Sequence, residues 1–291
     1  MSTATVKTPR PAGSPGPDAG TPPVKPGVDE GRIGLRANLR HIGALVRRNA
    51  LQIKQDPESM MDALLMPIVF TLLFVYVFGG AIGGGKGGSR DDYVQYLVPG
   101  MMGMMSMSIA MAVGTGINED FRKGVMDRFR SMPIARSSVL IAKSLVEVGR
   151  MLVAIIVLLT VGILVGFDVN GHWLGMLGAI GLTALFGSAL LWVFIIVGLT
   201  MRTAQAVQGI SFLVLMPLQF GSSVFVPTGT MPGWLKAFTD VNPLTHVADS
   251  ARGLMLGQGE VGSPVMWTVI WSVGLTLATA PFAIAMFRKK T

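Results

Sequence analysis

The residues of this chain that could carry out chemistry are few and far apart. A glycine-rich run from Gly80 to Gly87 matches seven positions of the phosphate-binding pattern G-x-x-x-x-G-K. The eighth position should be a serine or threonine that holds Mg²⁺, but Gly87 stands there. The run also follows an apolar stretch, whereas a phosphate-binding loop follows a strand and opens a helix. We therefore expect no nucleotide site here, and the sequence contains no other Walker-like segment.

Enzymatic chemistry is not indicated either. The histidines, His41, His172 and His246, are scattered, and none belongs to a His-Glu-x-x-His metal motif. The absence of cysteine excludes disulfides and thiolate metal sites. An intramembrane hydrolase or proton relay would need ionisable residues deep within its apolar segments. We expect no catalytic residue, no metal and no cofactor in this chain.

A methionine-rich run could bind apolar ligands, because methionine is flexible and polarisable. Four of its residues are candidates for the lining of a substrate path: Met101, Met104, Met105 and Met111. The alternative is ordinary helix packing, helped by the small residues Gly100, Gly103, Ser106 and Ser108. The sequence leaves both interpretations open.

The most charged block of the chain lies between Asn118 and Lys143. Within it Phe121, Val125 and Phe129 recur at every fourth position, which predicts a helix with one apolar face. Charged residues would form the rim of that face: Glu119, Arg122, Lys123, Asp127 and Arg128. A helix of this kind could dock into a cleft on another protein. A solvated connector is the alternative.

Long apolar stretches must position these residues. There are six: Ala63–Ile82, Leu97–Ile117, Met151–Phe167, Trp173–Leu199, Ala206–Val226 and Val265–Phe287. A helix needs about 20 residues to cross the hydrocarbon core, and lipid offers no partner for unpaired backbone groups. We therefore predict an all-α membrane protein with six transmembrane helices. The short third stretch can extend backwards if Glu147 and Arg150 lie at the interface or face protein.

The distribution of Lys and Arg gives the orientation. With both termini in the cytoplasm, 13 juxtamembrane Lys and Arg lie inside and four lie outside. Apolar residues make up 51% of the chain and charged residues 14%, against about a quarter in soluble domains. The net charge of +8 therefore indicates contact with anionic lipid rather than with nucleic acid.

Two segments flank the membrane part at the N-terminus. Residues 1–30 hold seven of the 17 prolines and almost no large apolar side chain, which predicts a disordered cytoplasmic tail. From about Ile33, apolar residues recur at helical spacing with arginines on the other faces. We expect this basic amphipathic helix to lie along the inner membrane interface. The alternative is a soluble helix packed on a partner.

The long connection between the fifth and sixth stretches, Pro227–Pro264, is expected outside and contains a helix at about Val241–Leu256. Asn242 can cap this helix, Pro243 suits its first position and Gly257 can end it. Its apolar stripe indicates that it dips into the outer leaflet or packs on the bundle.

The segments Gly124–Pro133, Val241–Gly253, Tyr93–Gly100 and Val226–Gly233 together resemble one family. The chain is similar to ABC-2 type permeases, specifically the daunorubicin/doxorubicin-resistance permease group of actinobacteria. The likeness extends from about Asn38 to Arg288.

The resemblance implies an ABC-2 permease domain over residues 31–291 that forms a multi-pass protein of the bacterial inner membrane. It implies a coupling helix at about Asn118–Phe129 and an outside re-entrant segment at about Pro227–Leu256, marked by Pro227, Asn242, Pro243, Asp249 and Arg252. In the family two permease subunits pair, and two separate ABC ATPase subunits bind ATP and Mg²⁺. The expected cargo is a hydrophobic drug or antibiotic. A lipid or glycan exporter is the alternative, and a membrane-embedded enzyme is a third reading.

Overall fold

The computed structural model describes residues 61, 65, 68–79, 89–125, 136–169, 172–257 and 259–290. Their helices are η2 (Phe74–Phe78), α4 (Arg90–Arg122), α6 (Arg136–Val165), α7 (Trp173–Thr200), α8 (Ala204–Phe220), η3 (Thr228–Thr230), α9 (Gly233–Val241), α10 (Pro243–Leu256) and α11 (Gly262–Lys290). No strand occurs in this part of the chain, so the predicted all-α class is confirmed.

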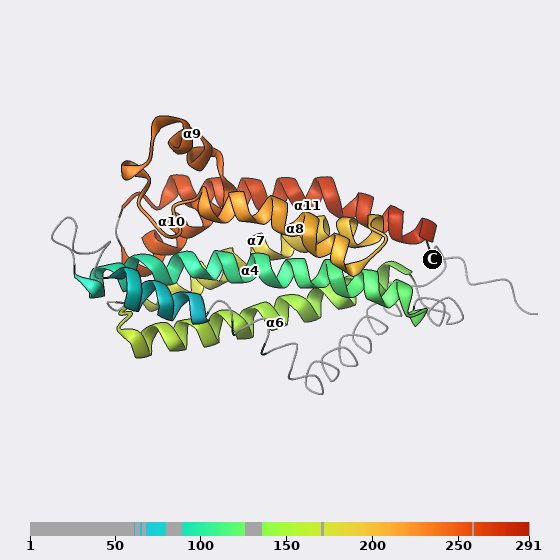
Figure 1. Cartoon of the computed structure of the whole chain (residues 1–291), viewed down its shortest axis with the longest axis horizontal. Coiled ribbons are helices and arrows are strands. Elements are labelled where there is room, and N and C mark those ends of the chain that lie inside the picture. The colour runs from blue at the N-terminus through green and yellow to red at the C-terminus, as the bar shows by residue number, and fades with distance from the viewer. Residues whose placement is uncertain are drawn as a thin grey trace, which may run out of the picture.

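The long helices lie lengthwise beside one another (Figure 1). Helices α9 and α10 lie at one end of the bundle, which we call the α10 end, and α11 finishes at the other, which we call the C-terminal end. The predicted N-terminal tail, the interfacial helix and the glycine run Gly80–Gly87 lie outside the described residues.

Among the described residues, four helices are long and apolar enough to cross a membrane: Arg90–Arg122, Val139–Val165, Trp173–Thr200 and Gly262–Lys290. They correspond to the second, third, fourth and sixth predicted stretches. The other two stretches contain the shorter apolar helices Ile68–Val77 and Ala204–Phe220. At 1.5 Å per residue the latter is about 25 Å long, less than the roughly 30 Å of the hydrocarbon core.

The predicted fifth span, Ala206–Val226, was wrong at its C-terminal end. Helix α8 ends at Phe220, with Gly221 at its C-cap, and residues 221–226 leave the helix. The amide of Asn242 donates hydrogen bonds to the carbonyls of Leu218 (2.8 Å) and Gly221 (2.7 Å). A side chain that is distant in sequence therefore satisfies the carbonyl groups that the helix end leaves open.

The third span is longer than its apolar core, because α6 begins at Arg136. Within it, Arg150 Nε and Glu147 Oε2 form an ion pair at 2.9 Å. The two side chains are only 9% and 11% exposed, so they face protein, which was one of the two placements expected. Pairing lowers the cost of burying these charges among apolar residues.

Helix α10 confirms the prediction made from its caps. The Asn242 side chain accepts a hydrogen bond from the Leu244 amide at 2.9 Å, and Pro243 occupies the first turn. Gly257 has φ +63°, the left-handed conformation that commonly ends a helix. The separate helix α9, which precedes it, was not predicted.

Helix α4 is the central element of the bundle. It contacts η2, α6, α7, α8 and α10, and 83% of its most apolar window is buried, against 11% for α11. Helix α4 approaches α7 most closely where Gly114 of α4 meets Gly198 of α7. A Cβ atom on Gly198 would lie 2.2 Å from the carbonyl oxygen of Gly114, and one on Gly114 would lie 2.5 Å from that of Phe194. Glycine is therefore required at this crossing, as in other close packings of membrane helices.

This crossing yields a prediction about stability. Gly198→Val should lower the thermal midpoint of the detergent-solubilised protein by several degrees, because overpacking typically costs about 1–3 kcal/mol. Gly209→Val in α8 is the matched control, since nothing lies within 4 Å of a Cβ at Gly209. The midpoints can be measured by heating followed by size-exclusion chromatography. Equal midpoints for the two variants would contradict the close approach of α4 and α7.

Candidate functional site

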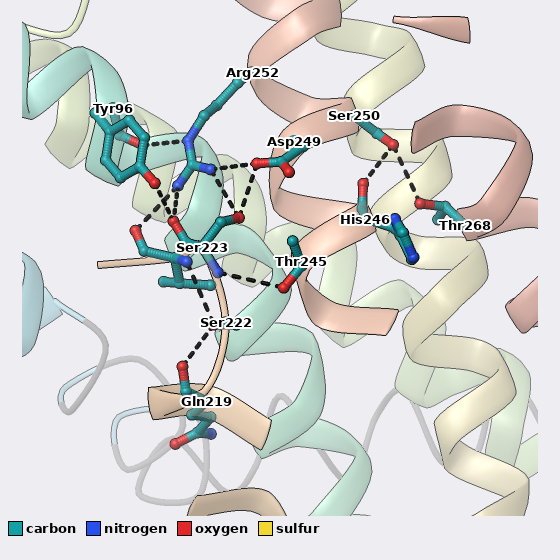
Figure 2. Close-up of polar contacts among 11 residues, drawn as sticks. Tyr96, Gln219, Ser222, Ser223, Thr245, His246, Asp249, Ser250, Arg252 and Thr268 are labelled. Atoms are coloured by element: carbon teal, nitrogen blue, oxygen red, sulfur yellow. Dashed lines mark hydrogen bonds and ion pairs between the residues drawn. The ribbon is translucent and has the colours of Figure 1, made fainter. Parts of the chain in front are cut away.

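Polar residues gather at both ends of α4, and the cluster at the α10 end is centred on Arg252. All five N–H groups of its guanidinium donate hydrogen bonds (Figure 2). Nε donates to the carbonyl of Tyr96 at 2.8 Å. Nη1 donates to Ser223 Oγ at 3.1 Å and to Asp249 Oδ1 at 2.7 Å. Nη2 donates to the carbonyls of Ser223 at 2.8 Å and Val224 at 3.0 Å.

Arg252 thereby joins three segments: α4, residues 221–226 and α10. The guanidinium carbon also lies 3.7 Å from the centre of the Tyr96 ring, a cation–π contact. The Tyr96 hydroxyl donates to the Ser223 carbonyl, and the Ser223 hydroxyl donates to Asp249 Oδ1 at 2.8 Å. We call this set of Tyr96, Ser223, Asp249 and Arg252 the Arg252 cluster.

The Arg252 cluster satisfies backbone carbonyls that would otherwise be buried without a partner. Residues 221–226 are not helical, so their carbonyls need hydrogen-bond donors from elsewhere. Besides Arg252 and Tyr96, the Tyr93 hydroxyl donates to the Phe225 carbonyl at 3.3 Å. The arginine charge is balanced by Asp249, and both groups are engaged within the chain. The arrangement therefore holds three segments together.

Helix α10 is also attached to α11. The hydroxyls of Ser250 and Thr268 lie 3.1 Å apart (Figure 2). The rings of His246 and Trp267 are stacked with centroids 5.9 Å apart. The Arg252 cluster and these contacts together connect α10 to the two long helices α4 and α11.

The five residues that marked the predicted outside segment therefore do not form one site. Asp249 and Arg252 meet in the cluster, while Asn242 and Pro243 form the start of α10. Pro227 is exposed and immediately precedes η3. Tyr96 and Ser223 were not predicted as site residues. A tyrosine next to a proline-containing apolar stretch gave only a weak signal for Tyr96, and nothing in the sequence singled out Ser223.

The second cluster lies at the C-terminal end of the bundle, around the last turns of α4. The Asn118 amide donates to the carbonyls of Gly198 at 3.0 Å and Met201 at 2.7 Å, at the end of α7. Asp120 forms an ion pair of 2.5 Å with Lys143 of α6. These residues attach the end of α4 to two neighbouring helices.

Phe121 attaches the same end of α4 to α11. Its ring meets that of Phe287 edge to face, with centroids 5.7 Å apart. Lys290, at the end of α11, donates a hydrogen bond to the Leu199 carbonyl of α7. Phe121, predicted as an anchor for a partner, therefore packs within its own chain.

The predicted helix Asn118–Phe129 is not a separate element as far as it is described. Residues 118–122 are the last part of α4, Lys123 is its C-cap and Gly124 has φ +68°. Because this left-handed residue stands between Phe121 and Val125, the two do not share one continuous helical face. Asp127, Arg128 and Phe129 lie outside the described residues.

The charged residues that are described here point to the surface. Lys123 pairs with Glu119 at 2.9 Å, and this hydrogen bond raises the pKa of Lys123, so the side chain is cationic at neutral pH. Arg122 is exposed and has no ion pair with the described residues. Glu119, Arg122 and Lys123 line an open depression together with Ala204 and Gln205 at the start of α8. Their role in binding a partner remains a prediction.

The methionines of α4 lie inside the bundle. Met101 and Met105 are fully buried, Met104 is 9% exposed, and Met111 is partly buried against the core. In this conformation they pack between helices. The proposed substrate lining at these four residues stays a prediction.

Comparison with known proteins gives the class of the chain. The family model of the ABC-2 type transporter matches residues 40–256, and the chain belongs to this family. It is 36% identical to the daunorubicin resistance ABC transporter permease protein DrrB1 of Streptomyces coeruleorubidus over 257 residues, which cover 88% of this chain and 85% of the relative.

More distant relatives carry similar names. The probable doxorubicin resistance ABC transporter permease protein DrrC of Mycobacterium tuberculosis is 25% identical over 81% of this chain and 84% of its own length. The probable multidrug ABC transporter permease YbhR of Escherichia coli is 24% identical over 68% of this chain and 54% of its own length. The family resemblance seen in the sequence is confirmed, and the relatives are transport permeases rather than enzymes.

The Arg252 cluster leads to a second prediction. Arg252→Lys keeps the positive charge but cannot reproduce the five-donor fork, so carbonyls of residues 221–226 lose their partners. Leaving buried groups unsatisfied costs about 1–3 kcal/mol each, so the thermal midpoint should fall clearly.

Arg90→Lys is the matched control at the same end of α4. Arg90 is exposed, and its guanidinium lies 4.2 Å from the centre of the Tyr76 ring, a contact that a lysine can also make. If both variants melt at the wild-type temperature, the Arg252 cluster does not hold the three segments together.

Proposed function

We propose that this chain is the membrane-spanning subunit of an ATP-driven exporter whose cargo is a hydrophobic drug or antibiotic. The observation that carries the proposal is the 36% identity to a daunorubicin resistance ABC transporter permease across most of both chains. ATP would be hydrolysed by a separate ABC ATPase, because the sequence contains no complete nucleotide-binding motif. Two permeases and two ATPases would form the assembly.

The proposed topology has six membrane passages, with the C-terminal end of the bundle in the cytoplasm and the α10 end outside. The concentration of Lys and Arg near the C-terminal end supports this orientation: Arg122, Lys123, Lys143, Arg202, Arg288, Lys289 and Lys290. Helix α8 and the helix at Ile68–Val77 would supply the remaining two passages together with neighbouring residues.

Helix α4 offers a physical route for coupling. It has 33 residues and is about 50 Å long. Its cytoplasmic end is attached to α6, α7 and α11 through Asp120, Asn118 and Phe121, and its other end is attached to α10 by the Arg252 cluster. A displacement that the ATPase imposes on this end would therefore reach the outside segment through a single continuous helix.

Export can be tested in an efflux-deficient host that co-expresses this permease with a candidate ABC ATPase from the same organism. Cellular fluorescence of daunorubicin should fall several-fold only when both proteins are present. An ATPase variant that lacks its phosphate-binding lysine is the control and should not lower it. ATP hydrolysis by the purified permease alone would contradict the proposed division of labour. Partner ATPase activity that depends on the permease, without daunorubicin export, would retain the subunit role and refute this cargo.

The orientation can be tested with single cysteines, because the natural chain has none. Ser89→Cys and Lys236→Cys lie at the α10 end and should react with an impermeant maleimide in intact cells or spheroplasts. Gln205→Cys and Lys289→Cys lie at the C-terminal end and should react only after the membrane is opened. All four native residues are exposed. The reverse labelling pattern would refute the proposed topology.

A further inference from the structure

We infer that Glu147 and Arg150 of α6 form a binding site in the middle of the bundle. This site receives a neutral oxygen acceptor, such as the carbonyl oxygen of a ketone or quinone, on a largely apolar molecule. The inference deepens the proposed function and rests on it, since the ligand is taken to be the cargo of the exporter.

The first argument is the depth of the pair. Met151, the neighbour of Arg150, packs where α4 and α7 meet: a Cβ atom on Gly187 would lie 2.3 Å from Met151 Sδ and 2.9 Å from Ser106 Cβ. Ser106 is the middle residue of α4, and Gly187 and Arg150 lie at the middle of α7 and α6. The pair therefore lies near half the height of the bundle. An ionisable residue at this depth is costly in a membrane protein and marks a functional site by default.

The second argument is unused hydrogen-bonding capacity. Arg150 Nε and Glu147 Oε2 approach to 2.9 Å as an ion pair, but neither atom makes a hydrogen bond within the described part of the chain. No other polar contact of Arg150 occurs among the residues that the structure describes. A guanidinium has five N–H donors, and Arg252 uses all of its own. A ligand oxygen can therefore bind Arg150 without displacing a partner.

Two buried hydroxyl groups add to this capacity. Ser144 lies one turn before Glu147 on α6, and Thr183 lies one turn before Gly187 on the same face of α7. Both residues are at most 9% exposed, and neither hydroxyl makes a hydrogen bond with the described residues. A hydroxyl inside a helix can donate to the carbonyl four residues earlier, as Thr160 of α6 does. Helices α6 and α7 therefore bury more hydrogen-bonding groups than the fold satisfies.

The third argument is that the pair attaches no helix to another. Glu147 and Arg150 lie three residues apart on α6, so their contact joins no two elements. Asp120 and Lys143, by contrast, join α4 to α6, and Arg252 joins three segments. A buried ion pair is often no more stabilising than apolar side chains of similar size. A contribution to stability therefore does not explain the two charges at this depth.

The charge balance and the surroundings of the pair indicate the kind of ligand. One carboxylate and one guanidinium cancel, so a charged ligand group would bring an uncompensated charge into an apolar interior. A neutral oxygen acceptor adds no charge and matches the unused N–H donors of Arg150. The following turns of α6 bury the apolar side chains Ala154, Ile155, Leu158 and Leu159, which suit an apolar ligand body. The side chains of the pair are 9% and 11% exposed, so α6 must move before a ligand can enter.

Ligand binding to the purified permease tests the inference without the ATPase. The probes are tritiated anthraquinone and tritiated anthracene, which share one apolar ring system and differ in the carbonyl oxygens of the quinone. Binding is measured by scintillation proximity, and binding to protein-free micelles is subtracted. We expect the wild type to bind anthraquinone at least fivefold more tightly than anthracene.

Variants of the pair show whether it causes this preference. Glu147→Leu combined with Arg150→Met replaces both charges by apolar side chains. This double variant should lose the preference for anthraquinone, while its thermal midpoint should equal or exceed that of the wild type. Glu147→Leu combined with Arg150→Gln keeps N–H donors at position 150 and should retain at least a twofold preference. Thr160→Val is the matched control, because Thr160 is exposed on the same helix, and it should bind both probes as the wild type does.

Three results would overturn the inference. The first is that the wild type binds the two probes equally or binds neither. The second is that the folded Glu147→Leu, Arg150→Met variant keeps the preference for anthraquinone. The third is that this variant melts clearly below the wild type, which would assign the pair to stability.

Daunorubicin, which carries quinone carbonyls, separates this inference from the proposed function. If the wild type with its ATPase exports daunorubicin and Glu147→Leu, Arg150→Met exports it equally well at equal expression, the inference fails and the proposed function stands. If the wild type exports no daunorubicin, the proposed cargo fails. A preference for anthraquinone that depends on the pair would still establish the binding site.

Discussion

Lipid tails are as apolar as leucine, so excluding water cannot hold two membrane helices together. Close contact between backbones can do so, and in this chain it occurs where Gly114 of α4 meets Gly198 of α7. The other contacts depend on this crossing. Asn118 can reach the end of α7 only because the two helices are already close, one helical turn after Gly114. The position of α4 at the centre of the bundle follows from the same constraint.

The two ends of α4 are held by different chemistry. At the C-terminal end the contacts are an amide, one ion pair and two aromatic rings, each directed at a different helix. At the α10 end a single guanidinium makes most of the polar contacts. Buried backbone carbonyls explain the difference, because residues 221–226 have left the helix and must be satisfied by side chains. The Arg252 cluster is the means by which an irregular segment is accommodated beside apolar helices.

Local signals in the sequence predicted local structure well. Asn242, Pro243 and Gly257 lie next to the helix ends that they form, so α10 could be located from these residues alone. The end of α8 could not be placed, because the groups that satisfy it come from Asn242 and Arg252, more than 20 residues away.

The same reason explains why the contact of Phe121 could not be predicted. Its spacing suggested a surface anchor, but its contact is Phe287 on the last helix. A pattern within one segment carries no information about a partner so distant in sequence. The predicted apolar face also failed at Gly124, whose left-handed backbone interrupts the helix that the spacing assumed. Of the charged residues predicted around it, Arg122 and Lys123 are exposed, and their role in binding a partner stays a prediction.

Because every N–H donor of the Arg252 guanidinium is used, the effects of substitutions at its neighbours depend on one another. Ser223, Asp249 and Tyr96 all contact one guanidinium, so a change at any of them alters the geometry available to the others. The energies of substitutions at these positions will not add, since residues that share a hydrogen-bonding partner are coupled. For the same reason residues 221–226 cannot separate from α4 one contact at a time. Detaching residues 221–226 from α4 would have to break the contacts of Arg252 with the Tyr96, Ser223 and Val224 carbonyls together.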